Sequence, residues 1–276
     1  MSDAPVSPVF FMHLLRAMRA VVGREINKFL RQPSRLASAL VRPLLWFVVF
    51  SAGFHNVFGV SIVPPYETYV EYQVYMVPGL LGMVALFNGM QSSLSMVYDR
   101  EMGVMRLLLT APLPRGWLLA FKLMGGTSLS LLQMLVFLLI ALAFGVEFSW
   151  AHLPLLLLAM VAGATLLAAL GLMLSVYIKQ LENFAGTMNF VIFPMFFISP
   201  ALYPLWKLDE SGAWWLLTLA QWNPFTHVVE AIRFAMYGQV NALSWTVVLV
   251  GATVFFCLAW WGYDPQRGWI KQRGAA

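Results

Sequence analysis

Residues 153–178 read LPLLLLAMVAGATLLAALGLMLSVYI and contain no charged side chain. A helix that crosses the hydrocarbon core of a bilayer needs about 20 consecutive, mostly apolar residues, so this stretch predicts a transmembrane helix. The whole chain has the same character: 61% of its 276 residues are hydrophobic and 11% are charged, whereas soluble domains carry about 25% charged residues. These figures predict an integral membrane protein.

Five further apolar stretches surround this one, and the six together predict an all-α integral membrane domain that covers residues 1–276. The predicted transmembrane helices are residues 36–58, 76–98, 117–144, 153–178, 185–205 and 243–263. Pro194, Pro200 and Pro204 predict kinks in the fifth of them.

Residues 9–32 mix apolar and basic side chains and predict an amphipathic helix ahead of the first span. Such a helix lies in the membrane interface, held by its apolar face and by anionic head groups. A cytosolic helix packed on other protein is the alternative. Pro33 ends or bends this helix. The first long apolar run begins only near Leu36, so no cleavable signal peptide is predicted.

Basic residues are distributed unevenly around the predicted spans. Seven lie in or before the first span, four lie around the loop between the second and third spans, one follows the fourth and three follow the sixth. Fifteen of the seventeen Lys and Arg residues thus fall on one side, and only Lys207 and Arg233 fall on the other. Because basic loops stay in the cytosol, both termini are predicted to be cytosolic. Arg42, near the inner end of the first span, can extend toward the interface. This clustering indicates topology signals and lipid contacts, not nucleic-acid binding.

Three features are predicted on the outer side. One lies before the second span, and two lie before the last span. Tyr66, Tyr69, Tyr72 and Tyr75 recur every three residues and predict an aromatic belt on a short helix, or alternatively a substrate-contacting exit surface. Residues 206–242 predict an outer re-entrant hairpin, because 213–222 is too short to span and 225–237 can form a second short helix. Asn223-Pro224 marks the turn between them. Glu230 and Arg233 stand three residues apart, close enough to pair on one helix face.

Several chemistries are not supported by the sequence. No glycine-rich loop followed by Lys and Ser or Thr is present, so no phosphate-binding loop is predicted. The four histidines are scattered without metal-ligand spacing, and Cys257 is the single cysteine. No Asp or Glu falls in the centre of a predicted span, as a proton- or ion-coupled carrier would need. Energy for any transport is therefore expected to come from another protein.

The loop 99–116 begins DREMGVMRLLLTAPLPR over residues 99–115. It predicts a short amphipathic helix that is charged at its start, apolar through Leu109 and stopped before Pro112. An exposed apolar ridge with flanking charges is typical of a helix that docks into a groove on a partner. An interfacial helix that touches only lipid is the alternative.

This loop resembles the cytosolic signature of ABC-2 type transporter permeases. The matching residues are Asp99, Arg100, Glu101, Gly103, Leu108, Leu109, Ala111 and Pro112. Residues 198–204 (ISPALYP) and 223–233 (NPFTHVVEAIR) are also similar to the family, and the resemblance covers nearly the whole chain. It is strongest to the drug-resistance and nodulation-factor export branch.

The resemblance implies a non-catalytic membrane subunit of an ATP-driven exporter in the bacterial inner membrane. Two permease copies would pair with two cytosolic ABC ATPases, which bind ATP and Mg²⁺, so this chain needs no cofactor of its own. Residues 99–113 would couple the ATPase to the spans, and the hairpin would act as an outer gate. The residues implied in that gate are Pro200, Tyr203, Asn223, Pro224, Glu230 and Arg233.

Polar residues on the second and third spans are candidates for lining a path for an amphipathic or lipid-like substrate: Asn88, Gln91, Ser95, Thr127 and Gln133. Hydrogen bonds between helices are the alternative explanation for them. At the level of function, the alternatives are a self-contained secondary carrier or channel and a membrane-embedded assembly factor.

One departure from the family generates a test. Many members carry Thr and Glu after the loop glycine, whereas this chain has Val104 and Arg106. Arg106 is expected to face an acidic patch on the ATPase, so Arg106→Glu should reduce coupled ATP hydrolysis in the assembled complex. Unchanged hydrolysis in this variant would exclude that contact.

Overall fold

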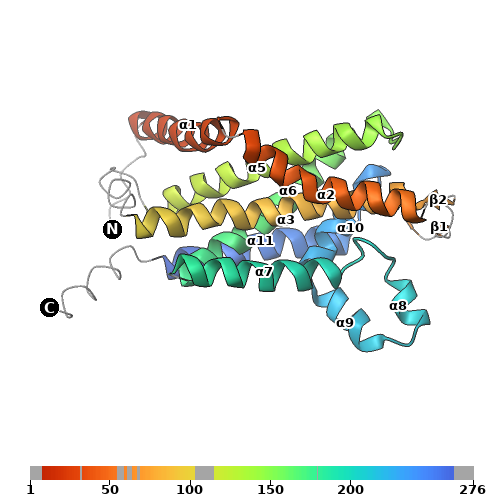
Figure 1. Cartoon of the computed structure of the whole chain (residues 1–276). Helices are drawn as coiled ribbons and strands as arrows, with labels where there is room; N and C mark the ends of the chain where they lie inside the picture. The colour runs from red at the N-terminus through yellow and green to blue at the C-terminus, as the bar shows by residue number, and fades with distance from the viewer. Residues whose placement is uncertain are drawn as a thin grey trace.

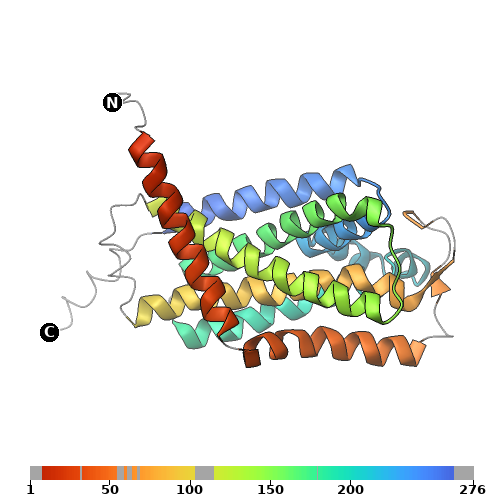
Figure 2. The ribbon, with the colours of Figure 1, turned by 90° about the horizontal axis from the view of Figure 1, so that it is seen from above.

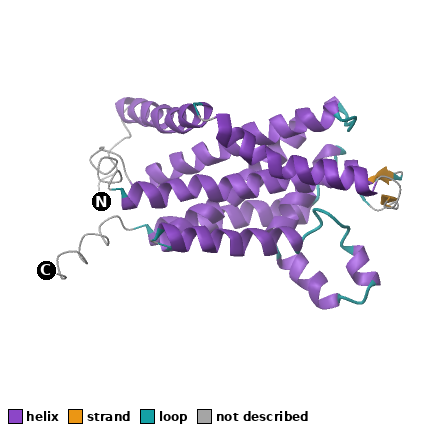
Figure 3. Ribbon diagram, in the orientation of Figure 1, coloured by secondary structure: helices purple, strands orange, loops and turns teal. Residues whose placement is uncertain are grey.

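The computed structural model describes residues 8–31, 33–54, 59–60, 64–66, 69–102, 115–178 and 180–263. Nearly all of them are helical (Figure 3). The helices are α1 (Pro8–Leu30), α2 (Pro33–Phe54), α3 (Tyr72–Glu101), α5 (Arg115–Ala143), α6 (Leu153–Tyr177), α7 (Leu181–Phe197), α8 (Trp206–Glu210), α9 (Trp214–Trp222), α10 (Pro224–Met236) and α11 (Ala242–Gly262). A 3₁₀ turn, η1 (Trp150–His152), precedes α6, and two short strands, β1 (Gly59–Val60) and β2 (Val70–Glu71), pair antiparallel.

Four of the predicted spans form helices that are long and apolar enough to cross a membrane. These are α3, α5, α6 with its preceding 3₁₀ turn, and α11. The predicted first and fifth spans also form helices, but within the described residues the apolar part of α2 covers only Leu40–Gly53 and α7 has 17 residues. The helical class is therefore confirmed, while the count of six spans stays a prediction.

The long helices run side by side in one bundle (Figure 1). Along the chain, α2, α3, α5, α6, α7 and α11 alternate in direction. The amphipathic helix predicted at 9–32 is α1, which crosses the bundle obliquely over α5 (Figure 2). We call the end of the bundle beside α1 the α1 end, and the opposite end, with α8, α9 and α10, the hairpin end. Helix α1 ends at Leu30, before Pro33, and Pro33 is the first residue of α2. Proline is common at the first position of a helix, where its missing N–H has no helical partner to lose.

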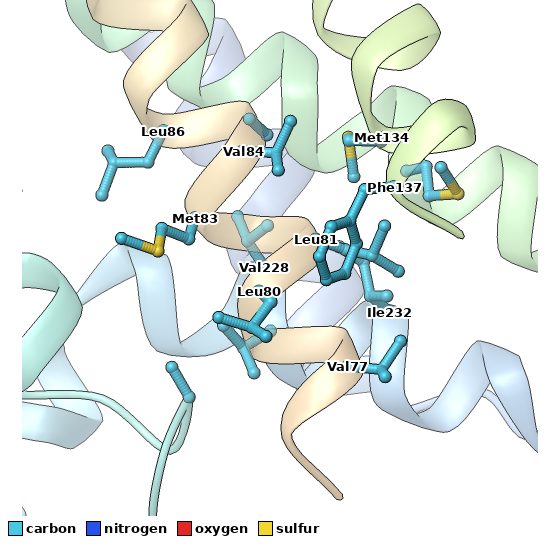
Figure 4. Close-up of a cluster of buried hydrophobic side chains, with 14 of the residues drawn as sticks. Val77, Leu80, Leu81, Met83, Val84, Leu86, Met134, Phe137, Val228 and Ile232 are labelled. Atoms are coloured by element: carbon cyan, nitrogen blue, oxygen red, sulfur yellow. The ribbon is translucent and has the colours of Figure 1, made fainter. Parts of the chain in front are cut away.

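Helix α3 is the centre of the bundle. Every residue from 75 to 90 is buried, because α2, α5, α6, α7 and α10 surround this part of the helix. In Figure 4, Leu81 of α3 lies beside Phe137 of α5 and Ile232 of α10. A helix that is apolar on all sides is buried on all sides, so α3 holds the outer helices together.

Helices α3 and α6 pack closely where small residues meet. A Cβ added to Gly171 would lie 2.7 Å from the carbonyl oxygen of Gly89, and one added to Gly89 would lie 2.9 Å from the carbonyl carbon of Leu167. Small residues let backbones approach closely where water does not drive association. Four small residues spaced along α6 are buried: Ala164, Ala168, Gly171 and Ser175.

Two sequence predictions are wrong in detail at the hairpin end. The fifth span was predicted at 185–205, but its helix ends at Phe197 and residues 198–205 form a turn. Pro200 contributes to this end, because the residue before a proline disfavours the helical conformation. The tyrosines from 66 to 75 do not share a short helix. Residues 70–71 form strand β2 and helix α3 begins only at Tyr72.

The hydroxyl groups of the α3 and α5 serines bond to their own helices. Each donates to a carbonyl three or four residues earlier: Ser92, Ser93, Ser95, Ser128 and Ser130. This is the ordinary way in which serine satisfies its hydroxyl in an apolar helix bundle.

The α3–α6 contact predicts the effect of a single methyl group. Gly89→Ala places a Cβ against the backbone of Leu167 and should cost about 1–3 kcal/mol through overpacking, more than helix propensity returns. The thermal midpoint in detergent should fall by about 3 °C or more. Gly186→Ala on α7, where a Cβ meets nothing within 4 Å, is the matched control and should leave the midpoint unchanged or raise it. Equal midpoints for the two variants would contradict the close contact.

Candidate functional site

The α1 end carries a cluster of charges that joins three helices, with Asp99 and Lys122 buried and Arg24 partly exposed. We call Arg24, Asp99 and Lys122 the charged junction. The Lys122 Nζ atom of α5 donates to Oδ2 of Asp99 at the end of α3 over 2.9 Å, and both side chains are less than 10% exposed. Nη2 of Arg24 on α1 lies 3.6 Å from the same Asp99 oxygen and 3.1 Å from Oε1 of Glu25. One carboxylate thus holds α1 and α5 against the C-terminal end of α3.

Glu101, two residues further on, connects the same region to α7. Its Oε1 accepts a hydrogen bond of 2.8 Å from the backbone N–H of Leu181, the first residue of α7. A carboxylate at a helix N-terminus satisfies an unpaired N–H and opposes the helix dipole favourably. The segment that leads into the loop 103–114 is therefore bound to α1, α5 and α7 at once.

Part of the predicted coupling segment can be placed in this junction. Asp99 and Glu101 make the contacts above, and Arg100 belongs to the last turn of α3. The other predicted coupling residues lie outside the described residues: Gly103, Arg106, Leu108, Leu109, Ala111 and Pro112. Sequence reasoning missed Arg24 and Lys122 as partners of Asp99, although Lys122 and Asp99 carry opposite charges on the two sides of one loop.

At the hairpin end, the end of α7 is satisfied by side chains. The carbonyls of Met195 and Ile198 accept from the Asn223 side-chain amide over 2.7 and 2.6 Å. The carbonyl of Phe196 accepts from the Ser199 hydroxyl over 2.6 Å, and that of Phe197 from the Tyr203 hydroxyl over 2.5 Å. These four consecutive carbonyls would otherwise lack helical partners. The two motifs 198–204 and 223–233 therefore meet at the end of α7.

Arg233 of α10 binds the same turn. Its guanidinium pairs with Glu230 and donates to the carbonyl of Pro200 over 2.5 Å, while Cζ lies 4.2 Å from the centre of the Tyr75 ring. The Tyr75 hydroxyl donates to the same Pro200 carbonyl over 3.1 Å. The Arg233 side chain is 4% exposed, so this pair is buried and not a surface ion pair.

Tyrosines close this cluster from the start of α3. The Tyr72 hydroxyl donates to the carbonyl of Leu202 over 2.8 Å, and the Tyr66 ring lies 5.1 Å from the Tyr237 ring at an edge-to-face angle. Burial raises the pKa of the Tyr66 phenol, against the opposing effect of Arg233. Of the four periodic tyrosines, only Tyr69 is exposed, so most of them pack inward and do not form a belt.

All the residues predicted at the outer hairpin thus fall in one cluster: Pro200, Tyr203, Asn223, Pro224, Glu230 and Arg233. Asn223 is the N-cap of α10, since its Oδ1 accepts from the N–H of Phe225 over 3.0 Å, and Pro224 is the first helical residue. The two predicted short helices are α9 and α10, and α10 is buried between α3, α6 and α11.

The polar residues in the middle of the bundle divide into two groups. Asn88 donates to the Ser130 hydroxyl over 2.8 Å, Thr127 contacts Thr165 over 3.5 Å, and Ser95 bonds within α3. Gln91 and Gln133 line a pocket between α2, α3 and α5, and Asn88 also lines it. Within the described residues, no group of His, Cys, Asp or Glu side chains is placed to hold a metal ion.

Comparison with known proteins agrees with this architecture. The family model described as ABC-2 type transporter matches residues 16–237. The inner membrane transport permease YadH of Escherichia coli (strain K12) is 27% identical over 264 residues, which cover 93% of this chain and 98% of YadH. The transport permease ycf38 of Pyropia yezoensis is 25% identical over 92% of this chain and 88% of its own. The daunorubicin resistance ABC transporter permease protein DrrB1 of Streptomyces coeruleorubidus is 24% identical over 86% of this chain and 77% of its own.

The buried Arg233–Glu230 pair predicts a strong asymmetry between single and double variants. Arg233→Met leaves the Glu230 carboxylate without its partner, which costs on the order of 3 kcal/mol and should lower the thermal midpoint by about 6 °C or more. The double variant Arg233→Met/Glu230→Gln removes the unpaired charge and should recover part of this loss.

Lys207→Met is the matched control for that experiment. Lys207 and Glu210 have the same i, i+3 spacing, but both side chains are about half exposed or more, so the midpoint should change by no more than about 1 °C. A similar loss in Arg233→Met and Lys207→Met would show that the Arg233 pair does not stabilise the hairpin end.

Proposed function

The chain belongs to the ABC-2 type transporter family, and we propose that it is the membrane subunit of an ATP-driven exporter of amphipathic or lipid-like compounds. Family members are transport components that normally pair with a separate ATPase, which hydrolyses the ATP. The relative named as a daunorubicin resistance permease motivates the choice of an amphipathic cargo.

The charged junction is the observation that carries the coupling part of this proposal. The loop 103–114 leaves α3 directly after Asp99 and Glu101, whose side chains bind α1, α5 and α7. Motion of the loop would therefore be transmitted to three helices. These helices could then move together as a rigid unit between two arrangements. In this mechanism the ATPase pushes on the loop and on α1 as it closes on ATP and Mg²⁺.

The orientation follows from the positions of the basic residues. We place the α1 end in the cytosol of a bacterium and the hairpin end outside, with both chain termini cytosolic and the protein in the inner membrane. In this arrangement α2 and α7 complete six spans. The 17 residues of α7 reach about 25 Å, close to the thickness of a bilayer core.

The hairpin end supports an outer gate. Residues 198–204, α9 and α10 are joined through Asn223 and Arg233 to the end of α7 and the start of α3. A rotation of α3 and α7 would therefore move the hairpin with them. We further propose that two copies of the chain pair in the membrane, each with one ATPase.

Reconstitution tests the function directly. Proteoliposomes with the permease and its partner ABC ATPase should accumulate an amphipathic fluorescent compound in an ATP-dependent manner, and vesicles with the permease alone should not. Uptake by the permease alone, driven by an ion gradient or by the compound's own gradient, would establish a carrier or channel instead.

Asp99→Asn tests the junction in the same complex. The variant keeps the side-chain shape but removes the charge that holds Lys122 and Arg24. Substrate-stimulated ATP hydrolysis should fall at least about five-fold, the size of a typical coupling between two sites, while basal hydrolysis by the ATPase persists. Glu182→Gln, an exposed acid on α7, is the control and should retain stimulation. Full stimulation in Asp99→Asn would remove the junction from the coupling path.

A further inference from the structure

A polar pocket lies inside the bundle between α2, α3 and α5. Its volume is about 120 Å³, and its polar lining consists of Arg42, Asn88, Gln91 and Gln133. Pro43, Met83, Val84 and Phe87 supply the apolar part of the wall. The lining therefore contains one cation and three amides, but no carboxylate.

Gln133 is the most unusual of these residues. Gln133 is 1% exposed. Its side-chain Nε2 and Oε1 atoms are both buried, and neither has a hydrogen-bond partner among the described residues. Leaving a buried amide unpaired is costly, and such groups are rare unless a bound molecule satisfies them. Asn88, by contrast, uses its amide on Ser130.

Arg42 is the second group that needs an explanation. Its Cζ lies 4.0 Å from the centre of the Phe87 ring, and this cation–π contact is its one interaction in the part of the chain that the structure describes. Arg42 is an exposed residue that lines the pocket, whereas the buried basic residues Lys122 and Arg233 are paired with Asp99 and Glu230. An exposed guanidinium that lines a pocket and has no carboxylate partner among the described residues is free to pair with an anionic ligand.

Aromatic rings continue from the pocket toward the hairpin end. Phe87 lies 6.4 Å from Phe193 of α7, which lies 6.3 Å from Phe197. Trp46 of α2 lies 5.9 Å from Phe197 and 4.8 Å from Phe50. We call these five rings the aromatic strip. Phe193 and Phe197 are each more than 40% exposed, so the strip offers an accessible apolar surface next to the polar pocket.

We propose that this pocket binds the anionic oxygen head group, carboxylate or phosphate, of an amphiphile whose apolar part lies along the aromatic strip. Arg42 supplies the charge, because a guanidinium donates two parallel hydrogen bonds to such a group. The Gln133 and Gln91 amides donate to the remaining oxygens. Where the amphiphile is the transported compound, this inference rests on the proposed export function and gives that cargo an anionic head.

The purified permease in a neutral detergent provides the test, without ATPase or nucleotide. Binding of dansyl undecanoic acid and of its methyl ester is measured by energy transfer from tryptophan. The acid should bind saturably, and the ester, which has the same tail but no charge, at least about ten-fold more weakly, as loss of a charge-assisted hydrogen bond predicts.

Two variants and a control localise the binding. Arg42→Gln and Gln133→Leu should each weaken binding of the acid about ten-fold and leave ester binding unchanged, which also shows that the variants are folded. Arg19→Gln removes an exposed basic residue of α1 and should leave acid binding as in the unmodified protein. Equal affinity for acid and ester, or an equal loss in Arg19→Gln and Arg42→Gln, would overturn the proposal.

Nanodiscs distinguish the two sources of such a ligand. If phosphatidylglycerol nanodiscs displace the acid and phosphatidylcholine nanodiscs do not, the occupant is a resident anionic lipid. If the acid stays bound in both, the occupant is a transported amphiphile. Failure of the acid to bind in both kinds of nanodisc would overturn the site, whereas failure of ATP-driven transport in proteoliposomes would leave these binding results unchanged.

Discussion

The ends of a helix carry backbone N–H and C=O groups without helical partners, and side chains from other parts of the chain satisfy those of α7. At its start the N–H of Leu181 donates to Glu101, and at its end the carbonyls of Met195 and Ile198 accept from Asn223. Helix α7 is thus joined at one end to the start of the loop 103–114 and at the other end to the hairpin.

This arrangement connects the two ends of the molecule through few contacts. Glu101 follows Asp99, so the carboxylate that binds α7 lies two residues from the one that holds α1 and α5. At the other end, Arg233 and Tyr75 share the carbonyl of Pro200. Between the two ends, the glycine contact of α3 with α6 leaves little free volume to absorb a displacement. A movement at the α1 end can therefore pass through side-chain contacts and helix packing to the hairpin end.

Hydrophobic length predicted the helices well, because a membrane protein must form uninterrupted apolar helices to satisfy its backbone. The hairpin pair α9 and α10 and the Glu230–Arg233 contact were also predictable, since spacing along one helix decides them. The turn at residues 198–205 was not predictable. Its composition is as apolar as that of a helix, and only the side chains that cap the end of α7 reveal the turn. The contact of Asp99 with Arg24 was equally hidden, since it depends on how α1 crosses the bundle.

The sidedness of the loop 103–114 is the most direct measurement of this coupling mechanism. In a Cys257→Ser background, Arg106→Cys and Asp209→Cys each introduce one thiol, and a membrane-impermeant maleimide labels them in vesicles of known orientation. Residue 106 should react only in inside-out vesicles and become protected when the ATPase binds, while residue 209 on α8 should react only in right-side-out vesicles. Labelling of residue 106 from the outside, or unchanged labelling in the presence of the ATPase, would contradict the mechanism.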